Sequence, residues 1–129
     1  MALPRPARDD LTIPYGPVVQ ADFDALLELL DRETMREIIA MFTESCPQRI
    51  GAMHGGLAGG DLVAVATAFH TMRSGCGQLG ARELEELCAL GERAAKAGST
   101  QDAAAVLVRV EAELALVFGW FRAQGWMDA

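Results

Sequence analysis

Apolar side chains recur every three or four residues from residue 22 onward, the spacing that places them on one face of an α-helix. Asp22 is expected to be the N-cap of a short first helix. Its apolar face consists of Phe23, Leu26, Leu27 and Leu30. A long second helix has a continuous stripe formed by Met35, Ile38, Phe42, Cys46, Ile50, Met53 and Leu57. Pro47 lies inside this stripe without changing its phase, so it predicts a bend, and Gly59-Gly60 predicts the helix end.

Three further amphipathic segments follow. Asp61 can cap a third helix, whose predicted buried stripe is Leu62, Val65, Phe69, Met72, Cys76 and Leu79. Gly80 marks the junction to a fourth helix with the stripe Leu84, Leu87, Cys88, Gly91 and Ala95. Ser99 and Asp102 form a capping pair for a fifth helix. Its stripe steps by four and three residues in turn, through Ala103, Leu107, Val110, Leu114, Val117 and Phe121.

Long helices with short links predict an all-α fold, an antiparallel up-down four-helix bundle with a short additional N-terminal helix. The bundle is expected to occupy residues 21–125. Residues 1–20 contain four of the five prolines and no helical period, which predicts an extended tail, with Val18–Val19 packing on the body.

Composition excludes several classes of function. The 129 residues carry a net charge of −7, so the chain lacks the basic surface that binds a phosphate backbone, and nucleic acid is not expected as a partner. No apolar run approaches the roughly 18 residues of a membrane span, and the proline-broken N-terminus has no apolar signal region. Three cysteines without a CxxC spacing fit a reducing compartment, so a cytoplasmic protein is expected.

The third helix carries a second strip of side chains beside its core stripe. Its members are Ala66, His70, Arg73, Ser74 and Gly77. An imidazole beside a cation and otherwise small residues would let a large partner approach closely. A lone helical histidine is more often an ordinary surface residue, and Gly75 and Gly77 also fit tight helix packing. The pattern alone leaves both interpretations open; His54, with no cation beside it, is read as ordinary.

The segment 68–81, AFHTMRSGCGQLGA, resembles the phosphoacceptor motif of histidine-containing phosphotransfer (HPt) domains of multistep two-component phosphorelays. That family reads approximately A-H-x-L-K-G-S-[small]-x-x-[aliphatic]-G-A. The resemblance covers about residues 22–124, including the proline-interrupted second helix and the Leu84…Leu87-Cys88…Glu92 pattern of the fourth. It implies a relay that carries a phosphoryl group between receiver-domain aspartates.

The resemblance also implies a role for four residues. His70 is the phosphorylated residue, through its Nε2 atom. Arg73 matches the family's lysine, which helps to hold the phosphoryl group. Gly77 matches a small residue that keeps the approach open for the partner. Glu92 matches a position that can hydrogen-bond Nδ1 of the histidine and so fix its tautomer.

This chain departs from the family at two places. Arg73-Ser74-Gly75 stands where the family has Lys-Gly-Ser, which changes the hydrogen bonding on the phosphate side. Gly91 stands where a larger aliphatic residue is common, so a looser core is expected at that point of the fourth helix.

The chain has no glycine-rich nucleotide loop and no acidic cluster spaced for Mg²⁺, so we expect a phosphorelay intermediate without autokinase activity and without a cofactor. The resemblance places Mg²⁺ in the partner, a receiver domain of a response regulator or hybrid histidine kinase. That partner is expected to dock on the third helix around His70, aided by the apolar surface of the first. A monomeric, free-standing shuttle is expected.

Two other functions stay open. A degenerate bundle could act as a docking adaptor with unphosphorylated His70, and the departures at 73–75 support it. A metal- or haem-binding bundle could use His70, His54 and a cysteine, although neither histidine has a second ligand at i+4 and Cys76 and Cys88 lie on core stripes.

Overall fold

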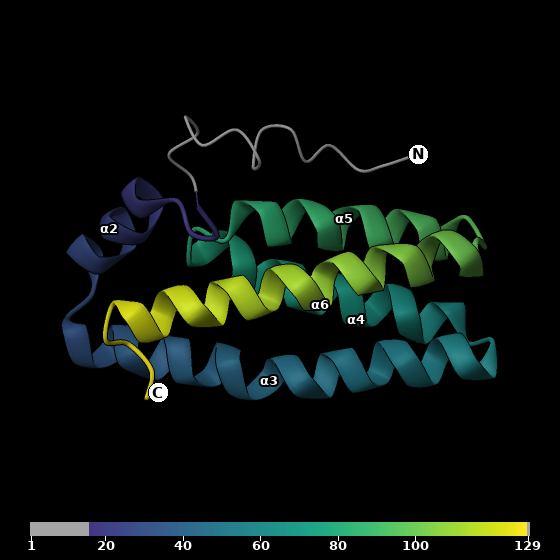
Figure 1. Ribbon diagram of the computed structural model, residues 1–129, viewed down its shortest axis with the longest axis horizontal. Helices are drawn as coiled ribbons and strands as arrows, with labels where there is room; N and C mark the ends of the chain where they lie inside the picture. Colours follow the sequence, from purple (N-terminus) through teal and green to yellow (C-terminus); the bar gives the residue numbers. More distant parts are fainter. Residues whose placement is uncertain (1–15, 129) are drawn as a thin grey trace.

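The computed structural model describes residues 16–128, which form five helices. Helix α2 (Gln20–Leu29) is short, and the long helices are α3 (Arg32–Gly59), α4 (Leu62–Gln78), α5 (Arg82–Lys96) and α6 (Thr100–Ala123). The four long helices alternate in direction, each lying beside the next, and α6 returns to lie along α3 (Figure 1). Helix α2 covers the end of the bundle where α3 begins and the chain ends. The predicted antiparallel bundle with an additional N-terminal helix is confirmed.

The helix boundaries follow from local signals in the sequence. Asp61 accepts a hydrogen bond from the Ala64 backbone N–H, and Ser99 accepts one from Asp102, so both predicted caps are present. Pro47 lies inside α3 without ending it. Gly60 ends α3 with a φ of 73°, a left-handed conformation that glycine adopts at little cost.

The predicted cap of α2 is wrong. The N-cap is Val19, which makes no side-chain cap bond, and Asp22 lies in the first turn of the helix. The Asp22 carboxylate instead accepts hydrogen bonds from Arg82 at the start of α5. Asp22 therefore pairs with a residue sixty positions further along the chain. The residues next to Asp22 in the sequence indicate only a local capping role, so they do not reveal this ion pair. Just before the helix, Val18 is buried, and the Val19 N–H donates to the Gly80 carbonyl at 2.8 Å.

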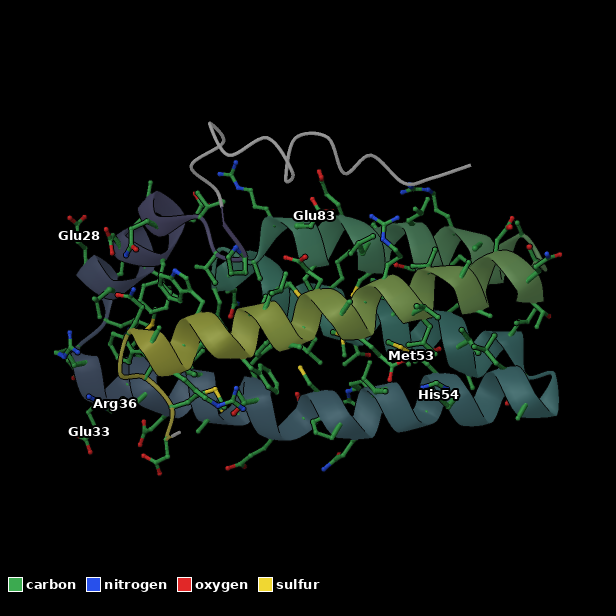
Figure 2. All side chains as sticks on the ribbon, viewed as in Figure 1. Glu28, Glu33, Arg36, Met53, His54 and Glu83 are labelled. Atoms are coloured by element: carbon green, nitrogen blue, oxygen red, sulfur yellow. The ribbon has the colours of Figure 1, made fainter. Side chains whose placement is uncertain are left out.

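The core is formed by the inner faces of all five helices. Every predicted stripe residue of α5 and α6 is buried. In α3, four of the seven predicted stripe residues are buried: Met35, Phe42, Cys46 and Met53. Ile38, Ile50 and Leu57 are only partly buried, and beside Ile38 it is Ile39 that is fully buried. Because helical stripes advance by either three or four residues, the spacing alone does not decide which of two adjacent isoleucines faces the core. At the α2 end, Arg36 donates to the Gly125 carbonyl and lies over the Trp126 ring, which fixes the C-terminal segment against α3 (Figure 2).

Candidate functional site

His70 lies on α4 with its imidazole directed out of the bundle. On the same helix Phe69 is fully buried and Met72 almost fully buried, whereas the His70 side chain is 57% exposed. Nδ1 lies 3.1 Å from Oε2 and 3.3 Å from Oε1 of Glu92 on α5. A carboxylate can only accept, so the hydrogen belongs on Nδ1, and the lone pair of the neutral ring is on Nε2. Nε2, which does not face Glu92, is therefore the basic nitrogen of the neutral ring.

Glu92 is the buried polar centre of the site, only 6% exposed. Besides His70, its carboxylate contacts Lys96 Nζ at 2.9 Å and Arg73 NH1 at 3.4 Å. The hydrogen bond from Lys96 holds the pKa of Glu92 below its ordinary value of 4.5, against the opposing effect of burial, and the charges of Lys96, His70 and Arg73 lower it further. Glu92 is therefore an anion at neutral pH.

Arg73 lies one turn from His70 on α4, as the sequence predicts. Its guanidinium group contacts Glu92 and is not free in solvent. The contact is long and the side chain is 38% exposed, so the guanidinium group can leave Glu92 without unpacking the bundle. Its role toward phosphate stays a prediction.

The inverted pair Ser74-Gly75 has a packing explanation. Ser74 is exposed, whereas Gly75 faces α3, where a Cβ atom would lie 2.9 Å from the Phe42 ring. Glycine at position 75 lets α4 approach α3 closely. The inverted pair lies within the continuous helix α4, on which His70 and Arg73 are one turn apart.

Gly77 is exposed on the same helix, but the space above it is occupied. A Cβ atom there would lie 2.6 Å from Oε2 of Glu85, which reaches across from α5. The residue accommodates this carboxylate, and whether it also keeps the path open for a partner stays a prediction.

Ala66 does not belong to the exposed strip, contrary to the sequence prediction. It is only 7% exposed, on the side of α4 that faces α5. It lies in the wall of a hollow of about 530 Å³ between α4 and α5 that extends from His70 and Glu92 to Leu62. A side chain one turn from an exposed residue can point toward a neighbouring helix, and the sequence does not say which helix that is.

Two site residues escaped the sequence analysis, Glu85 and Lys96. Both had a signal, since Glu85 and Lys96 are seven and four residues from Glu92 and so share the face of α5 that meets α4. That signal becomes useful only when Glu92 is known to face His70.

His54 lies on α3 in the half of the bundle away from α2 (Figure 2). Its Nε2 is 3.3 Å from Glu111 on α6, and both side chains are well exposed.

The three cysteines are buried, and burial raises the pKa of the Cys46 thiol to about 12. Within residues 16–128, no three His, Cys, Asp or Glu side chains gather where they could hold a metal ion. No helix in the same range could span a membrane.

Known proteins resemble this chain in both fold and sequence. The fold is similar to the crystal structure of histidine-containing phosphotransfer protein B (HptB) from Pseudomonas aeruginosa PAO1, with a TM-score of 0.79. The two chains are 24% identical over 84% of this chain and 93% of the other. No curated protein matches the sequence. The sequence model of the Hpt domain matches residues 37–120, which include His70, Arg73, Gly77 and Glu92. The chain therefore belongs to the Hpt domain family, whose members carry out histidine phosphotransfer in phosphorelays.

Proposed function

We propose that His70 accepts a phosphoryl group on Nε2 from the aspartyl phosphate of one receiver domain and transfers it to the aspartate of another. The observation that carries this proposal is that the two ring nitrogens of His70 lie in different environments. Nδ1 faces the buried Glu92 carboxylate, while Nε2 belongs to a side chain that is 57% exposed. The nitrogen with the lone pair is the one that does not face Glu92, and we assign it to the partner.

In the forward step, the Nε2 lone pair attacks the phosphorus atom of the aspartyl phosphate. The new N–P bond forms as the bond from phosphorus to the aspartate oxygen breaks, and the aspartate leaves as a carboxylate. Phosphoryl transfer passes through a loose transition state, so catalysis consists mainly of positioning and of stabilising charge on the equatorial oxygens. As positive charge develops on the ring, Glu92 stabilises it through Nδ1–H.

Arg73 is the group on this chain that can stabilise the phosphoryl oxygens. It lies three residues from His70 on the same helix and is held to Glu92 only by a 3.4 Å contact. A guanidinium group can donate two hydrogen bonds to adjacent phosphate oxygens. We assign it to the transferring group once the partner is bound.

The remaining machinery is assigned to the partner. The receiver supplies the acidic pocket and Mg²⁺, so this chain acts as a phosphorelay intermediate without autokinase activity and without a cofactor of its own. Receivers of a response regulator or hybrid histidine kinase dock on α4 around His70. The apolar surface of α2, where Leu29 is 81% exposed, extends this docking face. A relay contact must release quickly, which favours a small, transient interface on a monomer. We place this exchange in the cytoplasm.

Transfer from a phosphorylated receiver tests the proposal. The protein should take up one acid-labile, alkali-stable phosphoryl group in the presence of Mg²⁺, and none from ATP alone. His70→Gln should abolish uptake with unchanged helical content, because the imidazole is exposed. His54→Gln is the matched control, since it removes the other exposed histidine that pairs with a glutamate, and it should behave as wild type. Label that survives in His70→Gln, or fails to appear with every receiver of the same cell, would favour the docking adaptor.

A further inference from the structure

The Glu92 carboxylate has three partners, of which the proposed transfer step uses two, His70 and Arg73. From α4, His70 and Arg73 face Glu92, and from α5 itself Lys96 does so. The Lys96 contact is the shortest of the three, at 2.9 Å. Of the two permanent cations, Lys96 therefore holds Glu92 more tightly than Arg73 does.

A pair of Glu and Lys four residues apart is common on helix surfaces and gives only a few tenths of a kcal/mol there. This pair differs because the Glu92 side chain is 8% exposed, while Lys96 is 67% exposed. A buried carboxylate needs partners that replace its lost hydration. Lys96 supplies charge from the solvent side to a carboxylate that α4 covers on its other side.

The transfer step requires Arg73 to serve two groups. In the unphosphorylated protein its guanidinium group contacts Glu92, and the phosphoryl group on Nε2 would compete for it. If Arg73 were the only cation on Glu92, its departure would leave a buried carboxylate paired with the imidazole alone. Lys96 contacts Oε2 of Glu92, the oxygen nearer to His70 Nδ1, whereas Arg73 contacts Oε1. Lys96 can therefore stay on the carboxylate when Arg73 leaves it.

We propose that Lys96 is a positioning residue, whose ammonium group keeps the Glu92 carboxylate charged and fixed against Nδ1 of His70 while Arg73 turns to the phosphoryl group. The expected effect of Lys96 on the transfer rate rests on the proposed function, whereas its expected effect on the His70 imidazole does not. Lys96 touches neither the ring nor, in this account, the phosphoryl group. It acts on the histidine through Glu92.

The test compares Lys96→Met with Lys96→Arg, which restores the charge, and with Arg93→Met. Arg93 is an exposed cation on the same helix, next to Glu92 in sequence, so its removal changes the net charge equally. Two readouts need no partner. Carbon NMR of the carboxyl group follows the pKa of Glu92, and nitrogen NMR of the His70 ring measures the share of the Nδ1–H tautomer at neutral pH.

Lys96→Met should raise the pKa of Glu92 and lower the share of the Nδ1–H tautomer, and it should slow transfer from a phosphorylated receiver. Lys96→Arg should restore all three properties, and Arg93→Met should match wild type. In a Glu92→Gln background, Lys96→Met should have no further effect on tautomer or rate, because the carboxylate through which it acts is absent.

Two results would overturn the inference. One is an unchanged tautomer in Lys96→Met, and the other is a loss of rate that is as large in the Glu92→Gln background as in wild type. Failure of the proposed function has a different signature: wild-type protein takes up no label while the NMR readouts still respond to Lys96.

Discussion

Replacing Gly91 with alanine should destabilise the bundle, even though alanine is the better helix former. Gly91 is buried on α5, where a Cβ atom would lie 2.5–2.7 Å from three carbons of the Phe69 ring. Phe69 is fully buried, so its ring can give way only by displacing its neighbours in the close-packed core. The looser core expected at Gly91 is wrong, since the ring fills the volume that a larger side chain would take.

The magnitude follows from two opposing contributions. Alanine in place of glycine within a helix stabilises by about 1 kcal/mol. An additional methyl group in a filled core costs about 1–3 kcal/mol in strain. We therefore expect Gly91→Ala to lower the free energy of unfolding by about 0–2 kcal/mol. Gly51→Ala is the control, because Gly51 is an exposed residue within α3 whose Cβ would meet nothing within 4 Å. It should stabilise by about 1 kcal/mol.

Urea unfolding of both variants measures the difference. With a slope of about 2 kcal/mol per M, a gap of about 2 kcal/mol between the variants separates their midpoints by about 1 M. Phe69→Leu should relieve part of the strain, so the double variant should show a coupling of at least about 0.5 kcal/mol. Equal stabilisation by Gly91→Ala and Gly51→Ala would refute the packing argument.

Three other changes test the site. Arg73→Ala should slow transfer by roughly ten- to a hundred-fold, the equivalent of one charge-assisted hydrogen bond of ~1.5–3 kcal/mol. Arg73→Lys should largely restore the rate, and unchanged kinetics in Arg73→Ala would make Arg73 a surface residue only. Gly77→Phe should displace the Glu85 carboxylate and weaken receiver binding, measured by titration, more than it lowers thermal stability; the reverse would make Gly77 a packing residue. Glu92→Gln should be less stable than wild type at pH 7, because the lowered pKa of Glu92 contributes stability above its unfolded pKa. This difference in stability should narrow as pH falls through the folded-state pKa, which lies below 4.5. A difference that is independent of pH in urea unfolding would contradict the linkage.

The fold was largely predictable from the sequence because each long helix has one clear apolar stripe and visible end signals. Asp61, Ser99 and Gly60 act on residues within one turn of themselves, and such local effects can be read from neighbours in the chain. Asp22 shows the limit of this reasoning, since its partner Arg82 is brought to it only by the folded bundle.

The site was predictable in its residue types and less so in its contacts. His70 and Arg73 are neighbours on one helix, so their proximity follows from helical geometry alone. The partners from α5 depend on the register between two helices, which the sequence does not state. For that reason the sequence does not single out Lys96, and it does not show that the Glu85 carboxylate lies over Gly77.

The central claim is that the phosphoryl group is carried by Nε2 of His70, and the most direct test identifies the nitrogen that is bonded to phosphorus. The protein is labelled with ¹⁵N, phosphorylated by a receiver domain and kept at alkaline pH, where a phosphoramidate is stable. NMR coupling between phosphorus and the ring nitrogens then assigns the bond. Our account predicts one N–P bond, at Nε2 of His70, with Nδ1 still protonated and facing Glu92. A bond at Nδ1, or a phosphoryl group on His54, would contradict it.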